Sequence, residues 1–222
     1  MLDRILEPEV MDDAAEVAAY DAMDHQEVNA RFVTDFLAAH GPCRGGTILD
    51  VGVGPGRIPI ALCQADPKAN VLGIDLAAAM IDRARLNVAA AGLSDRIRLE
   101  WADAKALPYS DGSFEGVISN TILHHLPDPA RAMAEMARLV APGGTLLCRD
   151  LTRPGSAEAL DQLVARYAGS EAPAAQAMFA ASLHAALALD EVRAIVRSLG
   201  LPEDAVVMTS DRHWTWTWRR LG

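Results

Sequence analysis

A glycine-rich turn directly after a short apolar run is the feature that most restricts the fold of this 222-residue chain. The run is TILDV at 47–51, and its last two residues begin the turn Asp50-Val51-Gly52-Val53-Gly54-Pro55-Gly56. Glycines between a strand and a helix allow the backbone to approach a ligand closely. The helix beyond them presents free N–H groups and the positive end of its dipole. The segment therefore predicts a buried strand, a tight turn, and a helix start that can hold a nucleotide or a carboxylate.

Short apolar runs and amphipathic segments alternate after this turn. Strands are predicted at 47–51, 71–74, 97–101, 114–119 and 145–148, with helices between them. Because strands alternate with helices, we expect a parallel sheet covered on both faces. The helical pattern at 156–200 ends in a helix predicted to have Asp190 as its N-cap. Trp214, Trp216 and Trp218 stand at every second position of a predicted hairpin, so their indoles should share one face.

The charge balance disfavours a nucleic-acid substrate. Asp and Glu number 30 against 20 Lys and Arg, which gives a formal net charge of −10. Such a chain repels phosphate backbones, and it has no compensating basic stripe. No apolar run reaches the roughly 20 residues that span a bilayer, and the acidic N-terminus lacks a signal-peptide core. We therefore expect a cytoplasmic protein without a membrane or nucleic-acid partner.

The three cysteines give no sign of a metal centre. Cys43, Cys63 and Cys148 are odd in number and far apart, and no CxxC pair occurs. We expect buried free thiols, no disulfide framework and no metal site.

Two residues at the glycine turn distinguish between its possible ligands. Arg57 stands where the dinucleotide fingerprint requires a third glycine or an alanine. Asp50 precedes the glycines, where its carboxylate can accept a hydrogen bond from an ammonium group. A ligand with both an ammonium and a carboxylate group therefore fits better than a pyrophosphate.

The turn at 50–56 resembles the first motif of class I S-adenosylmethionine-dependent methyltransferases, in particular their small-molecule, methyltransferase-11-like group. Three further runs continue the resemblance in the correct order: WADA at 101–104, LPYSDGSFEGVIS at 107–119 and LVAPGGTLL at 139–147. Together these matches cover roughly residues 47–150.

The resemblance implies an α/β fold, namely a Rossmann-like, doubly wound, mostly parallel seven-stranded sheet with helices on both faces. The last strand should be antiparallel. We expect a single domain over 1–222, and its parts should be an N-terminal helical lid at 1–40, a cofactor-binding core at 47–150, a helical cap at 156–200 and a C-terminal strand hairpin at 205–219.

The resemblance also implies S-adenosylmethionine as the cofactor. Asp75 ends the second predicted strand about twenty residues after the glycines, where an acid can bind both ribose hydroxyls. The alternative is that Asp75 caps the next helix. Asp103 matches the residue near the adenine amine, and the alternative is a solvated turn residue. The predicted cofactor-binding residues are Asp50, Gly52, Gly54, Gly56, Asp75, Leu76, Ala102, Asp103, Ala104 and Asn120.

Three residues form the catalytic prediction: His125, Tyr20 and His25. His125 comes just after the fourth predicted strand, where a His-Leu pair faces the acceptor in some small-molecule members. The alternative is a histidine that only fixes this loop. His124 is less favoured, because adjacent residues on a helical turn point in different directions. Tyr20 and His25 belong to a polar-aromatic cluster, and family members often fold an N-terminal lid with a tyrosine over the site.

The predicted function is transfer of the methyl group of S-adenosylmethionine to a small-molecule O, N, S or C nucleophile, by a monomer or a homodimer. Such an in-line displacement needs alignment, and it needs a base only if the nucleophile must lose a proton. Three alternatives stay open: an NAD-dependent Rossmann oxidoreductase, an aminopropyl transferase, and a non-catalytic regulatory protein that binds S-adenosylmethionine.

Overall fold

The computed structural model describes residues 2–23 and 25–222. Asp24, which belongs to the polar-aromatic cluster of residues 20–25 in the predicted lid, lies outside the described residues. The strands are β1 (Thr47–Val51), β2 (Asn70–Asp75), β3 (Ile97–Trp101), β4 (Phe114–Asn120), β5 (Val140–Leu151), β6 (Val206–Met208) and β7 (His213–Arg219). The α-helices are α1 (Ala14–Asp21), α2 (Gln26–His40), α3 (Arg57–Ala65), α4 (Ala78–Ala90), α5 (Pro129–Leu139), α6 (Ala157–Ala168), α7 (Pro173–Ala185) and α8 (Leu189–Ser198). Two short 3₁₀ turns are η1 (Leu123–His125) and η2 (Glu203–Ala205).

The strands form one seven-stranded sheet in the order β3-β2-β1-β4-β5-β7-β6. β1 pairs in parallel with both β2 and β4, and β2 pairs in parallel with β3. β6 and β7 pair antiparallel. The predicted Rossmann-like, mostly parallel seven-stranded sheet is therefore confirmed. The strand order reverses between β1 and β4, and ligands of such sheets bind beyond the carboxyl ends of the strands at this reversal.

The chain divides into two compact units. We call residues 10–120, 134–148 and 217–222 the large unit, and residues 1–9, 121–133 and 149–216 the small unit. The predicted single domain with its lid and cap stays a prediction.

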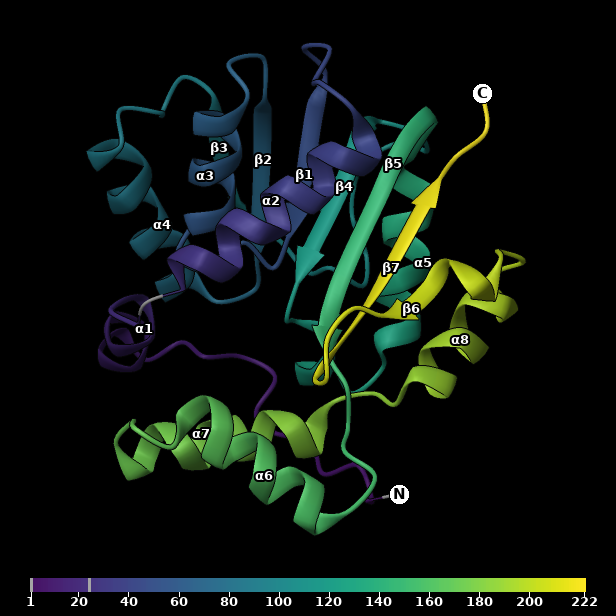
Figure 1. The fold of residues 1–222 in the computed structure, drawn as a ribbon. Coiled ribbons are helices and arrows are strands. Elements are labelled where there is room, and N and C mark those ends of the chain that lie inside the picture. The colour runs from purple at the N-terminus through teal and green to yellow at the C-terminus, as the bar shows by residue number, and fades with distance from the viewer. Residues whose placement is uncertain (1, 24) are drawn as a thin grey trace. The chain divides into compact units, whose positions relative to one another are not determined.

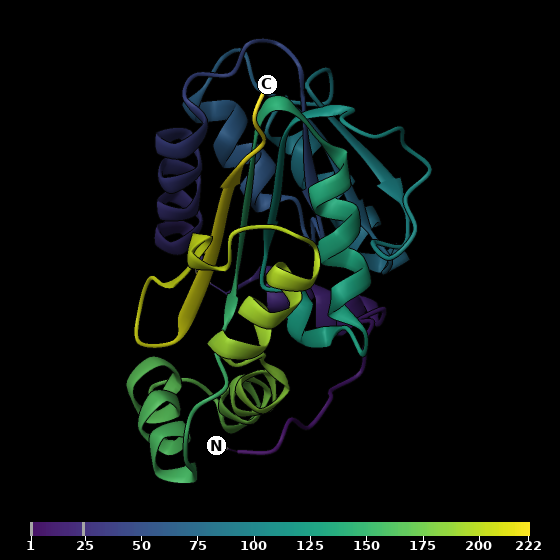
Figure 2. The same cartoon turned by 90° about the vertical axis from the view of Figure 1, so that its right-hand side faces the viewer.

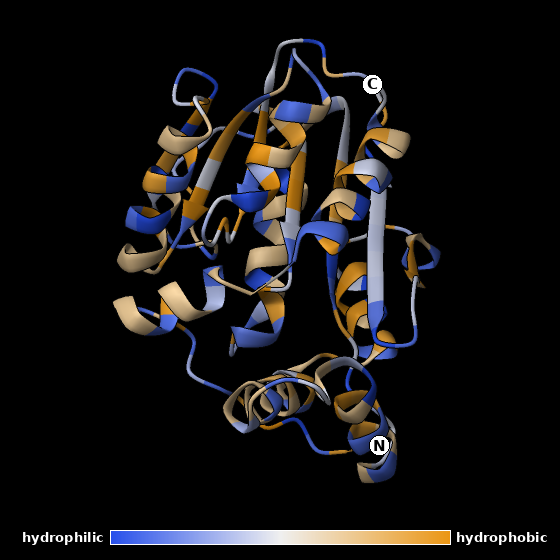
Figure 3. Cartoon of the chain, turned by 60° about the vertical axis from the view of Figure 1, so that its left-hand side comes forward, coloured by the Kyte–Doolittle hydropathy of each residue, from blue (hydrophilic) through white to orange (hydrophobic). Residues whose placement is uncertain are grey.

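One hydrophobic cluster of the large unit lies between the sheet and the helices α2, α3 and α4. Figure 1 shows α2, α3 and α4 beside β1, β2 and β3. Phe32 and Phe36 of α2 pack in one cluster with Leu62 of α3 and with Ile48 and Val71 of the strands. Figure 3 shows hydrophobic residues along the central strands and mixed colours on the helices, as expected of helices with one buried face.

The small unit has a core of its own around α6 and α7, which lie side by side in Figures 1 and 2. Leu160 of α6 and Leu183 of α7 pack with Leu151, and Leu2 of the N-terminal segment packs against the same cluster. Trp214 and Trp216 are fully buried on β7, as the two-residue period predicts, whereas Trp218 is only half-buried.

Two predicted boundaries are wrong. β5 begins at Val140 instead of 145, because the turn at 142–144 is drawn into the strand. There Gly143 N–H donates to the Arg220 carbonyl at 2.9 Å, and Arg220 N–H donates to the Gly144 carbonyl at 3.1 Å. Asp190 is not the N-cap of α8. The helix begins at Leu189, and the Glu191 carboxylate accepts the Ala188 N–H at 2.9 Å.

The three cysteines are buried free thiols, as predicted. Within the described residues, each helix is either too short or too polar to cross a bilayer.

Candidate functional site

The glycine turn after β1 has a backbone that side chains would not tolerate. Gly52, Gly54 and Gly56 have φ values of 76°, 51° and 78°, in the left-handed region that favours glycine. A Cβ on Gly56 would also lie 3.2 Å from the Cβ of Ala84 on α4. The turn is tied to β2, because the N–H groups of Gly52 and Val53 both donate to the Ile74 carbonyl at 2.9 Å. α3 begins just beyond Gly56, which gives it no side-chain cap, so its first N–H groups face this turn.

Asp50 stands at the end of β1 with a buried carboxyl group. The residue is 2% exposed, and its Oδ2 has no hydrogen-bond partner within the described part of the chain. Burial, and then the nearby negative charge of Asp75, raise the pKa of Asp50 to about 8. A buried acceptor without a donor is costly, so a ligand cation that donates to Oδ2 would bind favourably here.

Asp75 ends β2 and joins two loops through its carboxylate. Oδ2 accepts the Gly54 N–H at 2.9 Å, and Oδ1 accepts the Ala77 N–H at 2.9 Å. Ala77 is the N-cap of α4 and makes no side-chain cap hydrogen bond, so Asp75 is not itself the N-cap. Each carboxylate oxygen keeps further acceptor capacity for a ligand hydroxyl. Burial raises the pKa of Asp75 against the three backbone N–H groups that lower it.

The other predicted cofactor residues follow the ends of β2 and β3. The register pairs Asp75 with Trp101, and Ala102 N–H donates to the Asp75 carbonyl at 3.0 Å. The Trp101 indole N–H donates to the Leu76 carbonyl at 2.7 Å. Asp103 begins the turn that contains Ala104; its side chain is 41% exposed and lies 3.1 Å from Lys105 Nζ. The structure therefore brings Asp75, Leu76 and Ala102 together, while Asp103 stands in an open turn.

β4 carries Asn120 to the same end of the sheet. The register pairs Asp50 with Ile118, so Asn120 lies two residues farther toward the carboxyl end. The next residue, Thr121, has a φ of 59°, the one positive value of a non-glycine among the described residues. A β-branched residue in this conformation is strained, and such strain gathers at functional sites.

Helix α1 of the predicted lid packs on the start of α4. Tyr20 and Val17 contact the apolar cluster of Ala77 and Met80. The Tyr20 ring lies 5.3 Å from the ring of His25, centroid to centroid. Burial, and then the charge of Asp75, raise the pKa of the Tyr20 hydroxyl. Tyr20 and His25 are thus neighbours. The negative charge of Asp75, the predicted ribose-binding acid, acts on the Tyr20 hydroxyl.

Asp21 belongs to the polar-aromatic cluster of residues 20–25, but no role of its own was predicted for it. Its side chain is fully buried, and it accepts hydrogen bonds from Arg57 Nε and Nη2 at 2.7 and 2.9 Å and from Arg83 Nε at 2.5 Å. Asn87 Nδ2 donates to the same carboxylate and to the Pro55 carbonyl. Burial alone would raise the pKa of Asp21, but these donors outweigh it and the net shift is downward. Arg57, read from the sequence only as a break in the dinucleotide pattern, therefore ties α1 to α3.

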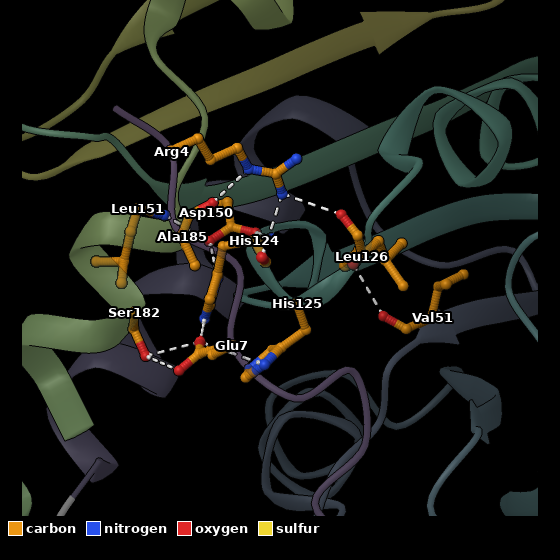
Figure 4. Close-up of polar contacts among 11 residues, drawn as sticks. Arg4, Glu7, Val51, His124, His125, Leu126, Asp150, Leu151, Ser182 and Ala185 are labelled. Carbon is orange, nitrogen blue, oxygen red and sulfur yellow. Dashed lines mark hydrogen bonds and ion pairs between the residues drawn. The ribbon is translucent and has the colours of Figure 1, made fainter. Parts of the chain in front are cut away.

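In the small unit, η1 presents the two adjacent histidines. His124 Nδ1 donates to Asp150 Oδ1 at 2.6 Å, and Asp150 Oδ2 accepts the His124 backbone N–H at 3.1 Å. The two imidazole centroids lie 4.2 Å apart, and both rings face Glu7 (Figure 4). The idea that the two side chains point in different directions is therefore wrong. The buried carboxylate partner belongs to His124, not to the predicted His125.

The surroundings set opposite pKa shifts on these rings. Burial lowers the pKa of His124, but the charges of Asp150 and Glu7 outweigh it and the net shift is upward. Burial and the neighbouring His124 lower the pKa of His125. Arg4 closes the cluster: its guanidinium donates to the carbonyls of Ala185, His124 and Leu126 at 2.7–3.2 Å.

The sheet order, the glycine turn after β1 and the acids at the ends of β1 and β2 are the features of a class I S-adenosylmethionine-dependent methyltransferase. Comparison with known proteins agrees, since residues 48–144 match a family model described as "Methyltransferase domain". This stretch of the chain is therefore similar to that family.

Named relatives and a solved structure extend the likeness beyond the core. The 27-O-demethylrifamycin SV methyltransferase of Amycolatopsis mediterranei is 35% identical over 83% of this chain and 65% of its own length. The demethylmenaquinone methyltransferase of Symbiobacterium thermophilum is 31% identical over 62% and 56%, respectively. The chain thus spans less than two thirds of these relatives. A crystal structure titled a putative S-adenosyl-L-methionine-dependent methyltransferase from Methanococcus maripaludis has a TM-score of 0.75 at 19% identity, covers 98% of both chains, and shows the same fold.

The residues at the glycine turn fit S-adenosylmethionine, the cofactor of this class. Its ammonium group would supply the donor that Asp50 Oδ2 lacks. Its carboxylate would suit the N–H groups at the start of α3. Asp75 offers acceptors for ribose hydroxyls beside the backbone N–H groups of Gly54 and Ala77.

Proposed function

We propose that this chain transfers the methyl group of S-adenosylmethionine to a nucleophilic atom of a small molecule. The observation that carries this function is the buried Asp50 Oδ2, which has no donor among the described residues and lies next to the glycine turn that precedes α3. A pyrophosphate would place negative charge beside this carboxylate, whereas an amino-acid ammonium would neutralise it. When bound, the cofactor supplies a methyl group on a sulfonium, and the displacement needs alignment of the acceptor.

The residues of the chain divide this work between binding and orientation. Asp50 would hold the ammonium group, Gly52, Gly54 and Gly56 would leave room for the amino-acid part, and Asp75 would bind the ribose. Leu76, Ala102, Asp103 and Ala104 would hold the adenine, and Asn120 would line the end of β4.

Tyr20 and His25 are the proposed lid residues. His125 is the proposed base or acceptor contact, because it comes directly after β4 in the chain. Its ring is 30% exposed, whereas that of His124 is 4% exposed and already bonded to Asp150. A proton acceptor for the substrate needs such access, and this keeps His125 as the candidate.

The acceptor is proposed to be a small metabolite. The names of the two relatives specify small-molecule substrates, and for the rifamycin enzyme the name places the methyl group on an oxygen. A net charge of −10 agrees with an acceptor other than nucleic acid. We propose a monomer or a homodimer, and a cytoplasmic location.

Two measurements test this function. Saturating S-adenosylhomocysteine, at about 100 times its dissociation constant, should stabilise the fold by roughly 2.7 kcal/mol, whereas NAD should not. The purified chain should then label a metabolite when it is incubated with methyl-labelled S-adenosylmethionine and a small-molecule extract. Stabilisation by NAD alone would indicate an oxidoreductase. Cofactor binding without labelled product from any extract would indicate a regulatory protein instead.

A further inference from the structure

Three side chains of the small unit direct polar atoms toward one another. Glu7 Oε1 lies 3.4 Å from His124 Nε2 and 3.3 Å from His125 Nδ1, and the three atoms all lie within 4.8 Å of one another. The side chains of Glu7, His124 and His125 are 12%, 4% and 30% exposed, respectively. Figure 4 shows the Glu7 carboxylate between the two rings, with Ser182 on its other side.

The separations suit a shared ion better than direct hydrogen bonds. An N–H···O hydrogen bond is usually 2.7–3.2 Å long, so both contacts to Glu7 are long. The bond from His124 to Asp150, at 2.6 Å, shows how close a paired imidazole and carboxylate come in the same cluster. Ligand atoms about 2.1 Å from a tetrahedral Zn²⁺ lie about 3.4 Å from one another. The distances from Glu7 Oε1 to the two imidazole nitrogens, 3.4 and 3.3 Å, match that spacing.

Each of the two imidazoles has, besides Glu7, a hydrogen-bond partner of the kind that metal-bound histidines have. A metal-ligating histidine normally donates its other ring N–H to a carboxylate or a backbone carbonyl, which fixes the tautomer and the ring orientation. Asp150 plays that part for His124 and leaves its Nε2 directed at Glu7. The Pro8 carbonyl accepts a hydrogen bond from the His125 ring.

We propose that Glu7, His124 and His125 form a binding site for a divalent cation of borderline softness, such as Zn²⁺, with Asp150 as the outer partner of His124. Three protein ligands leave a fourth position for water or for a ligand oxygen. This site departs from the expectation of no metal, which rested on the cysteines. Glu7 reaches the histidine pair only through the fold of the small unit. His125 is also the proposed base, and its Nδ1 cannot hold a cation and accept a substrate proton at the same time.

A second cluster of possible ligands, His40, Cys43 and Glu115 in the large unit, is less suited to an ion. Both Glu115 carboxylate oxygens already accept backbone N–H groups, from Arg44 at 3.1 Å and Gly46 at 3.0 Å. Burial and nearby carboxylates raise the pKa of the Cys43 thiol to about 12, and the thiolate is the form that binds metals.

The experiment uses the full chain without a histidine tag, stripped of metal with a chelator and dialysed. Calorimetric titration with Zn²⁺ should give one ion per chain, and Co²⁺ should give the intense visible absorption of a tetrahedral site. Glu7→Gln keeps the shape of the side chain but removes the anionic ligand. Loss of an outer partner of a metal ligand typically lowers metal affinity about 10–100-fold, so loss of a direct ligand should lower Zn²⁺ affinity by at least about tenfold. Asp150→Asn should lower the affinity about 10–100-fold.

Glu158→Gln is the matched control, because it makes the same change in the first turn of α6 in the same unit. It should bind Zn²⁺ like the unchanged chain. Three outcomes would each overturn the site. The first is that the unchanged chain binds no Zn²⁺, and the second is that the Glu7→Gln and Glu158→Gln variants bind it with equal affinity. The third outcome is loss of binding in Glu115→Gln but not in Glu7→Gln. If metal-free Glu7→Gln does not fold, His125→Gln replaces it in the titration. The His125 ring is partly exposed, so its loss should disturb the fold less, and Zn²⁺ affinity should fall in this variant too. Cofactor binding and turnover do not enter these readouts, so a negative result leaves the methyl-transfer function untouched.

Discussion

Asp21 and Arg57 are joined by two hydrogen bonds, of 2.7 and 2.9 Å, across 36 positions of sequence. The carboxylate is fully buried, while the guanidinium is 46% exposed. Because Arg83 and Asn87 bind the same carboxylate, one acid at the end of α1 fixes this helix to both α3 and α4. The N-terminal segment of the large unit is therefore held by charge as well as by its apolar contacts.

Replacing Asp21 should cost stability far more than replacing an exposed acid. Asp21→Asn leaves two guanidinium groups without their anion. We expect a loss of about 2 kcal/mol in unfolding free energy, below the 3–5 kcal/mol of fully buried pairs because both arginines are partly exposed. Chemical denaturation checks this result. Asp82→Asn is the control, since its pair with Arg85 is exposed and should be worth under about 1 kcal/mol. Equal losses in both variants would contradict the anchoring role.

Asp50 should make stability and cofactor binding depend on pH. The folded pKa is about 8, against about 3.9 in an unfolded chain. Between these values the folded protein keeps a proton that the unfolded chain has lost, so Asp50 makes stability fall as pH rises from about 4 to about 8. Denaturation at several pH values should reveal this fall in the unchanged chain and a smaller fall in Asp50→Asn.

Binding of S-adenosylhomocysteine should release the Asp50 proton, because its ammonium group favours the ionised carboxylate. Near pH 7, calorimetry in buffers of different ionisation enthalpy should measure proton release by the unchanged chain. The Asp50→Asn variant should release fewer protons. Identical release by the two proteins would exclude Asp50 as the ammonium partner.

Asp75 should affect both affinity and fold. Asp75→Asn removes the charge that ribose hydroxyls would bind. Its amide nitrogen also replaces one of the two oxygens that accept the backbone N–H groups of Gly54 and Ala77, so the cofactor-free fold should lose some stability as well. We expect weaker binding of S-adenosylhomocysteine by roughly 1.5–3 kcal/mol, the value of hydrogen bonds to a charged group. Titration calorimetry measures the affinity, and thermal unfolding without cofactor serves as the control. Unchanged affinity together with a lower melting temperature would reduce Asp75 to a loop-joining residue.

His125→Ala should lower turnover without weakening cofactor binding. A general base contributes about 10²–10⁴-fold in rate, and His125 belongs to the small unit, whereas the glycine turn belongs to the large unit. The test is a pair of measurements: turnover on the acceptor that labelling identifies, and the dissociation constant of S-adenosylhomocysteine. His124→Ala provides the contrast, because it removes the partner of the buried Asp150 and should destabilise the fold as well. Full activity of His125→Ala would point to an acceptor that needs no base.

The parts of the molecule that follow from local sequence were predicted well. β1, the glycine turn and α3 are encoded by one apolar run, three glycines and one amphipathic stretch, so no distant residue is needed to place them. Asp75 could be located because a strand end fixes its position. The length of β5 could not be predicted, since the backbone at Gly143 and Gly144 becomes a strand only where Arg220 pairs with it.

Contacts between distant segments explain what the sequence did not reveal. Asp21 looks like any acid at a helix end until Arg57 and Arg83 are brought to it by the packing of three helices. The proposed role of Glu7 likewise could not be predicted, because it depends on the contact of Glu7 with the histidines of η1 in the folded chain. Side-chain direction in a short 3₁₀ turn was misjudged because both His124 and His125 are drawn to the same carboxylate.

The contacts of Asp21 with α3 and α4 restrict the movement of α1. Arg57 is the first residue of α3, and Asn87, which also binds Asp21, donates to the carbonyl of Pro55 within the glycine turn. α1 therefore cannot swing away without disturbing the loop that would grip the cofactor. Any opening of α1 to admit or release a cofactor would therefore have to break this buried ion cluster first.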